Sequence, residues 1–214
     1  MEAAKIFCVS ESIRPNALLY GVTYGKAVGT LIEQAFQKYL NEYYIVQIGN
    51  SAKGIDLPAA EINTDIKVTS VNQPQSSCPF KDARQKIFGL GYNLLVLVYA
   101  KQDNIETKTA MLNFVSCSFI SKERTGDYLT TRILRQMLEN EANEEDIVGF
   151  LNDKNIPADE IMMGQLARQI LETPPEQGYL TISNALQWRL QYGRIVNMQE
   201  PVEGITRIVN RLRE

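Results

Sequence analysis

The eight residues 93–100, NLLVLVYA, are the most apolar stretch of the chain. A continuous apolar run of this length is typical of a strand that lies in the middle of a sheet and is buried on both faces. It is too short to cross a membrane, which takes about 20 apolar residues in a helix. No segment resembles a signal peptide. With 214 residues, the chain is expected to form one sizeable domain, or one core domain with a smaller appendage.

Helix and strand patterns alternate around this run. Residues 28–43 carry apolar side chains at helical spacing, which predicts an amphipathic helix. Further segments predict strands at 44–48, 61–70 and 109–120 and a short helix at 81–92 that ends at glycines. This order predicts an α/β fold, with a mixed sheet flanked by helices.

The pattern changes near residue 127. From there on, the segments predicted to be helices are 128–140, 144–153, 158–172, 181–192 and 201–214. We therefore expect an α/β part over residues 1–126 and a mostly helical region over residues 127–214.

The chain contains no histidine, which excludes several classes of active site. Ser-His-Asp and Cys-His nucleophile systems and histidine-ligated zinc all need that residue. No GxxxxGK[ST] segment occurs, so a P-loop is excluded as well. The three cysteines are widely spaced without a CxxC pair, and we expect buried free thiols in a reducing cytoplasm. Catalysis would have to rest on carboxylates, lysine, tyrosine or a metal.

The predicted strand 61–70, EINTDIKVTS, alternates apolar and polar side chains. Asp65 and Lys67 lie two residues apart on its polar face, about 6–7 Å from each other along the strand. Such a pair either keeps an exposed strand edge soluble or holds a divalent metal and a reacting phosphate. Aspartate is disfavoured inside strands, which favours the second interpretation.

A magnesium ion needs more than one carboxylate, because it takes about two protein oxygens besides water and phosphate. Asp56 lies nine positions before Asp65 and would supply the second ligand if the chain turns between them, as Pro58 favours. Glu61 is the wrong partner, because four residues along one strand place it about 13 Å from Asp65.

The pattern D-x8-D-x-K in IDLPAAEINTDIKV resembles the PD-(D/E)XK nuclease superfamily, and specifically type II restriction endonucleases. The resemblance covers about residues 25–100. It implies a glutamate from the preceding helix at the same metal site, and Glu33 matches that position. It also implies a helix and an apolar strand after the motif, where Arg84 and Gln85 would support the site or a phosphate.

From this resemblance we expect a cytoplasmic, Mg²⁺-dependent, site-specific endonuclease that cleaves double-stranded DNA as a homodimer, with no membrane partner. The helical region 127–214 would then serve DNA recognition or dimerisation. Asp56 and Asp65 would bind the metal, Glu33 would assist directly or through water, and Lys67 would steady the nucleophile and the transition-state charge. Two alternatives stay open. One is a repair or RecB-like DNA nuclease, and the other is a non-catalytic DNA-binding module with a nuclease-like fold.

Side chains suited to DNA contact lie in several polar segments. Amides can read adenine edges, and lysine and arginine can contact guanine or phosphate, although an ordinary polar surface would look the same. The candidates are Gln73, Gln75 and Lys81 in the loop after the motif strand, Arg84 and Gln85 in the short helix, and Asn184, Gln187 and Arg189 in the helix expected at 181–192. The net charge is −3, so contact with DNA depends on local clusters of positive charge.

Overall fold

The computed structural model describes residues 1–49, 54–78, 82–183 and 188–212. It divides into two compact units, and each unit combines stretches that lie apart in the sequence. Unit 1 comprises Met1–Ser76, Tyr92–Ser121 and Val196–Glu214, and unit 2 comprises Ser77–Gly91 and Lys122–Ile195.

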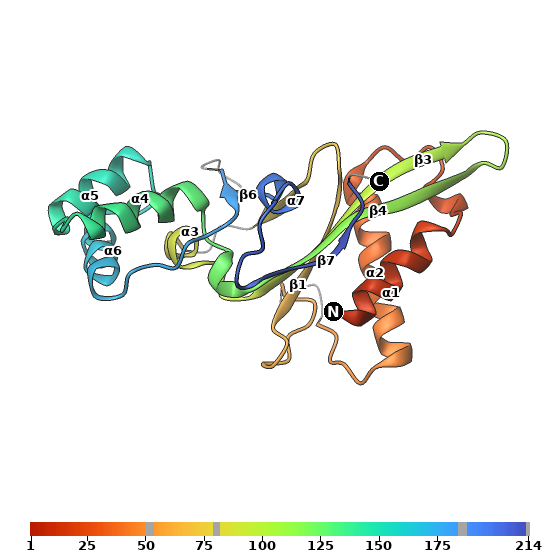
Figure 1. Cartoon of the computed structure of the whole chain (residues 1–214), viewed down its shortest axis with the longest axis horizontal. Helices are drawn as coiled ribbons and strands as arrows, with labels where there is room; N and C mark the ends of the chain where they lie inside the picture. The colour runs from red at the N-terminus through yellow and green to blue at the C-terminus, as the bar shows by residue number, and fades with distance from the viewer. Residues whose placement is uncertain (50–53, 79–81, 184–187, 213–214) are drawn as a thin grey trace. The chain divides into compact units, whose positions relative to one another are not determined.

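A mixed four-stranded sheet forms the centre of unit 1 (Figure 1). In spatial order its strands are β1 (Thr64–Ser70), β3 (Asn93–Asn104), β4 (Thr109–Ile120) and β7 (Ile205–Asn210). β1 runs parallel to β3, whereas β4 pairs antiparallel with both β3 and β7. The predicted α/β fold class with a mixed sheet is therefore confirmed.

The apolar run 93–100 occupies the interior position that its composition predicts. It lies in β3, between β1 and β4, and residues 94–99 are each at most 7% exposed. The strand continues beyond the run as far as Asn104, where its residues are exposed and form a hairpin with β4. The apolar run thus predicts the buried part of β3 but not its solvent-exposed end in the hairpin.

Two helices pack on one face of this sheet (Figure 1). They are α1 (Glu2–Ser12) and α2 (Gly25–Tyr43), joined by a segment that contains the 3-10 helix η1 (Ala17–Leu19). In α2, the residues Val28, Ile32, Phe36 and Leu40 are spaced by four and are all buried. This stripe meets the apolar face of β1, where Ile66 is completely buried.

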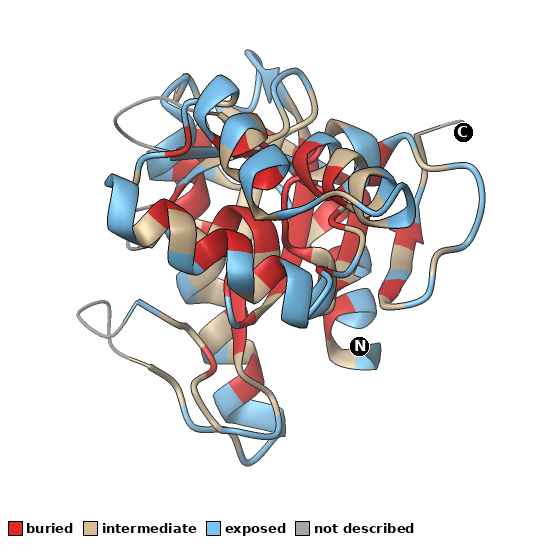
Figure 2. Ribbon diagram, turned by 90° about the vertical axis from the view of Figure 1, so that its left-hand side faces the viewer, coloured by how far each residue is buried: buried red, intermediate tan, exposed pale blue. Residues whose placement is uncertain are grey.

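Helices make up most of unit 2. They are α3 (Arg84–Phe88), the 3-10 helix η2 (Lys122–Arg124), α4 (Tyr128–Glu139), α5 (Glu144–Asp153) and α6 (Glu160–Glu172), while the short α7 (Gly193–Val196) ends at the boundary with unit 1. Leu134, Leu151, Leu166 and Ile170 are completely buried in their shared core. Figure 2 shows such buried stripes in red beside exposed helix faces in pale blue.

The short predicted helix 81–92 corresponds to α3, which ends at Gly89. Gly89 has φ 88°, and a Cβ added there would lie 2.4 Å from the backbone oxygen of Lys122. Both the left-handed conformation and the close approach require glycine.

Two predicted helices are wrong. In place of a helix at 201–214, Ile205–Asn210 forms β7, which pairs with the edge of β4. In place of a helix at 181–192, the chain forms β5 (Thr181–Ile182) and β6 (Trp188–Gln191), which pair antiparallel. Together with β2 (Gln75–Cys78) they form a second sheet of order β2-β6-β5. Both segments are rich in β-branched or aromatic residues, and a partner strand distant in sequence decides their conformation.

Two smaller predictions also need correction. Residues 44–48 belong to no strand, although Tyr44 is extended after the end of α2. The polar loop predicted after the motif strand contains the short strand β2 (Gln75–Cys78).

The boundary predicted at 126–127 stays a prediction. The chain passes between the two units at 121–122, and also at 76–77, 91–92 and 195–196.

The cysteines Cys8, Cys78 and Cys117 are buried and free, as predicted. Among the described residues, no helix combines the length and the apolar character needed to span a bilayer.

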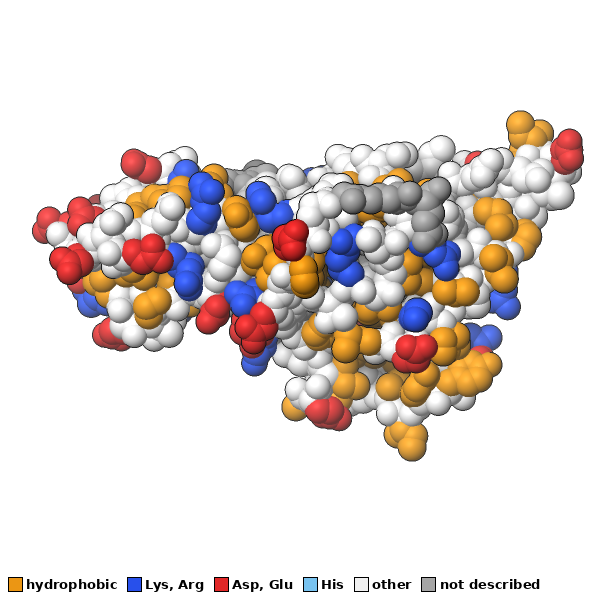
Figure 3. Space-filling model, viewed as in Figure 1, with side chains coloured by type: hydrophobic (Ala, Val, Ile, Leu, Met, Phe, Trp, Pro, Cys, Tyr) orange, Lys and Arg blue, Asp and Glu red, His pale blue; other side chains and the backbone are white. Residues whose placement is uncertain are grey.

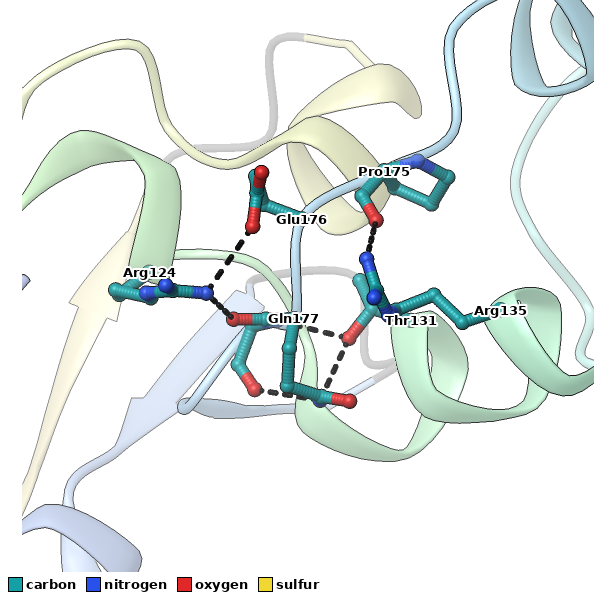
Figure 4. Close-up of polar contacts among 7 residues, drawn as sticks. Arg124, Thr131, Arg135, Pro175, Glu176 and Gln177 are labelled. Carbon is teal, nitrogen blue, oxygen red and sulfur yellow. Dashed lines mark hydrogen bonds and ion pairs between the residues drawn. The ribbon is translucent and has the colours of Figure 1, made fainter. Parts of the chain in front are cut away.

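A polar network fixes the start of α4 in unit 2. The Asp127 side chain accepts hydrogen bonds from the Thr130 backbone nitrogen (2.9 Å) and from the backbone nitrogen of Ile182 (2.8 Å), and it is 6% exposed. Figure 4 shows Thr131 and Gln177 in the adjoining contacts, where the Gln177 side chain donates to the Thr131 hydroxyl. The backbone nitrogen of Gly178 donates to the same hydroxyl. Asp127 therefore both caps a helix and joins it to a segment 55 residues later.

Asp127→Ala is expected to lower the free energy of unfolding by about 2–4 kcal/mol. Loss of the cap costs about 1 kcal/mol, and leaving the buried nitrogen of Ile182 unpaired costs about 1–3 kcal/mol. Asp159→Ala is the matched control, because Asp159 caps α6 in an exposed position and makes only the capping bond to Met162. Urea denaturation would contradict this account if the two variants lost equal stability.

Candidate active site

Asp65 and Lys67 project from the same face of β1, as their spacing predicts. The Lys67 ammonium lies 2.7 Å from Oδ2 of Asp65, and Asp65 is only 4% exposed. Between them, Ile66 points to the opposite face and packs against the helices. The sheet thus buries an aspartate that an exposed strand edge would have left in water.

The chain turns between Asp56 and Asp65, as the site requires. Leu57 and Thr64 pair through two backbone hydrogen bonds of 3.0 Å each, which closes a tight reversal. The Asp56 carboxylate consequently lies beside β1, where its Oδ2 accepts from the backbone nitrogen of Ile66 at 2.8 Å. The carboxyl group of Asp56 lies close enough to that of Asp65 to raise the pKa of Asp65.

Glu33 joins this group from α2. Burial raises the pKa of Glu33, the nearby Lys67 ammonium lowers it, and the Asp56 charge raises it further. Its position on the helix edge beside the buried stripe brings its carboxyl group within electrostatic range of both residues. The structure therefore brings together all four residues that the sequence singled out as catalytic.

The electrostatics of the site are dominated by crowded carboxylates. Burial raises the pKa of Asp65 to about 7; Lys67 opposes this shift and contact with Asp56 adds to it. Burial alone would lower the pKa of Lys67, but attraction to Asp65, Glu33 and Asp56 outweighs it and raises the pKa. When all four groups are ionised, three negative charges face one positive charge.

This donor set fits a divalent cation held by two carboxylates. Among the described residues, no group of three or more histidine, cysteine, aspartate or glutamate side chains is arranged to hold a metal ion. Mg²⁺ does not need such a cage, since it usually keeps several waters and takes one or two carboxylates. Asp56 and Asp65 could supply that pair, since the surplus negative charge around them favours a cation.

Sequence reasoning missed Gln37. Its Nε2 donates to Oδ1 of Asp56 at 2.8 Å, so it contacts the site directly. Gln37 lies four residues after Glu33 on α2, and residues at that spacing share a helix face. The spacing of four residues from Glu33 is the sequence feature that could have predicted Gln37 as a site residue.

Comparison with known proteins decides the family. The family model described as type II restriction enzyme NspV matches residues 1–207. The chain is also 57% identical over 202 residues to the type II restriction enzyme NspV of Nostoc sp. (strain ATCC 29411 / PCC 7524), covering 94% of this chain and 91% of that protein. The chain belongs to the NspV family of type II restriction enzymes. No solved structure matches it.

Membership of the NspV family confirms the prediction of a type II restriction endonuclease, a nuclease that acts on DNA. The family match extends through unit 2 and β7, well beyond the stretch 25–100 that carries the motif.

The residues predicted to contact DNA have different surroundings in this NspV-family enzyme. Gln73 is exposed in the turn after β1, and Gln75 is half-buried in β2. Arg84 donates from Nε to Oε1 of Gln169 at 3.0 Å, and Gln85 donates to the backbone oxygen of Leu90 at 3.1 Å. Both contacts lie within unit 2 and support its local fold.

Of the remaining candidates, Arg189 is exposed on β6. Lys81, Asn184 and Gln187 lie outside the described residues.

Proposed function

We propose that this NspV-family enzyme is a Mg²⁺-dependent endonuclease that cleaves double-stranded DNA at a specific sequence. The observation that carries the proposal is the meeting of Asp56, Asp65 and Lys67 at β1, with Glu33 facing them from α2. Carboxylates that share a cation beside a protonated amine are the groups that metal-assisted phosphodiester hydrolysis needs.

Each residue of this site has a distinct proposed role. Asp56 and Asp65 would hold the Mg²⁺, which supplies Lewis-acid activation of the phosphate and of water when it is bound. Lys67 keeps its proton, because the neighbouring carboxylates raise its pKa, and it donates to the charge that develops on the phosphate. Glu33 orients water at the edge of the site and accepts a proton from it.

Contact with DNA is proposed for the exposed side chains near the site and on β6. Gln73 follows the catalytic strand and is free to meet a base edge, while Arg189 is exposed and suited to phosphate. Gln75, Arg84, Gln85, Lys81, Asn184 and Gln187 stay candidates with them. The acidic first turn of α5, with Glu144, Glu145 and Asp146, is unsuited to contact with DNA because its charge repels phosphate; Figure 3 shows acidic side chains gathered over that end of unit 2.

We also propose a homodimer that acts in the cytoplasm. A sequence that reads the same on both strands is matched by a protein with two-fold symmetry, in which each copy cuts one strand. Light scattering of the purified enzyme with and without DNA tests this assembly, and a strictly monomeric enzyme on cleaved DNA would exclude it.

Digestion of phage DNA with Mg²⁺, followed by sequencing of the fragment ends, tests the proposed function. A restriction enzyme yields discrete fragments whose ends share one sequence. A smear or progressive loss from the ends would point to a repair or RecB-like nuclease, and binding without any cleavage would point to a non-catalytic DNA-binding module.

A further inference from the structure

Both oxygens of the Asp56 carboxylate are held by donors within unit 1. Gln37 Nε2 donates to Oδ1 at 2.8 Å, and the backbone nitrogen of Ile66 donates to Oδ2 at 2.8 Å. Two donors on opposite oxygens fix the plane of a carboxylate, yet each oxygen keeps a further lone pair. The two hydrogen bonds therefore fix the orientation of the Asp56 carboxylate, and both of its oxygens can still bind a cation.

Asp56 and Asp65 are held by donors of different charge. Asp65 contacts the Lys67 ammonium, whereas the donors to the Asp56 carboxylate are the neutral amide of Gln37 and the backbone nitrogen of Ile66. A neutral donor orients a carboxylate without competing for its charge, so the negative charge of Asp56 stays available to a cation.

Gln37 lies beside the buried stripe of α2, next to Phe36, and is half-buried itself. The same helix carries Glu33 one turn earlier, so α2 presents an acid and an amide to the site from one face. Gln34, also on α2, is exposed and makes no such contact.

We propose that Gln37 is a positioning residue for metal binding, which fixes the Asp56 carboxylate so that it can share a divalent cation with Asp65. This inference rests on the proposed function. Hydrogen-bond partners of metal-ligating carboxylates typically contribute about 10–100-fold to metal affinity. Gln37 is expected to contribute within that range, without contacting DNA.

The test compares Gln37→Met with Gln34→Met. Methionine keeps the length and helix preference of glutamine but cannot donate to Asp56. Titration of the DNA-free proteins with Mn²⁺ in a calorimeter should show an affinity about 10–100-fold weaker for Gln37→Met than for wild type, and unchanged affinity for Gln34→Met. Cleavage by Gln37→Met should need correspondingly more metal, while its KM for DNA stays at the wild-type value.

Equal Mn²⁺ affinity in Gln37→Met and wild type would overturn the inference, even if the variant melts at a lower temperature, because Gln37 would then serve packing alone. If Gln37→Met fails to fold, Gln37→Asn keeps the amide on a shorter stem and should give the same loss of affinity. If the wild-type protein itself neither binds Mn²⁺ nor cuts DNA, the result contradicts the proposed function, and not only the role of Gln37.

Discussion

Asp65→Ala is expected to abolish DNA cleavage, lowering kcat/KM by at least about a thousandfold. The substitution removes a carboxylate that would hold the cation, and metal stabilisation of the transition state amounts to several kcal/mol, at about 1.4 kcal/mol for each factor of ten. Asp65 also pairs with Lys67 and contacts Asp56, so no neighbouring acid can replace it in the same place.

Glu61→Ala is the matched control for this variant. It removes the same charge four residues earlier, from an exposed position before β1 begins. Cleavage by Glu61→Ala should match wild type, whereas Asp65→Ala should bind DNA and unfold near the wild-type temperature but leave the DNA uncut. Cleavage by Asp65→Ala at the wild-type rate with Mg²⁺ would exclude Asp65 from the active site.

Lys67→Ala is expected to lower kcat by about 10²–10³-fold, the usual loss when one donor to developing charge is removed. The KM for DNA should change little, because Lys67 is mostly buried and paired with Asp65 and not exposed to a duplex. Single-turnover cleavage measures this step directly. Mn²⁺ binding should persist, since both aspartates remain.

Lys108→Ala controls for the loss of one positive charge, because Lys108 is exposed near the β3–β4 hairpin. Lys67→Gln keeps a neutral donor and should retain more activity than Lys67→Ala. A loss confined to KM in Lys67→Ala, with kcat unchanged, would assign Lys67 to DNA binding and not to the chemical step.

The sequence predicted the fold class and the proximity of the candidate site residues, whereas the roles of those residues stay predictions. The two-residue period of a strand predicts that Asp65 and Lys67 lie on the same face. Asp56 was predicted as a neighbour of Asp65 because a magnesium ion needs a second carboxylate and the chain can turn between the two residues. Glu33 came from the family resemblance. Gln37 was not predicted as a site residue, because a polar residue on a half-buried helix face has many possible roles. Its role near the site is recognised only from its contact with Asp56.

The elements that sequence reasoning misjudged depend on distant partners. β7 forms because Ile205–Asn210 pairs with the edge of β4, and β6 lies beside β2, which comes much earlier in the sequence. Short segments such as these satisfy a helical pattern about as well as a strand pattern, so periodicity alone cannot decide between them. Helices such as α4, α5 and α6 were predicted well, because their hydrogen bonds and apolar stripes are local.

The central claim is that Asp56 and Asp65 together hold one divalent cation. Anomalous diffraction from crystals soaked in Mn²⁺ tests it most directly. The account predicts a peak about 2.1 Å from a carboxylate oxygen of each aspartate, a distance typical of small divalent cations such as Mg²⁺. Mn²⁺ bound only at other acidic residues, with neither Asp56 nor Asp65 as a ligand, would contradict it.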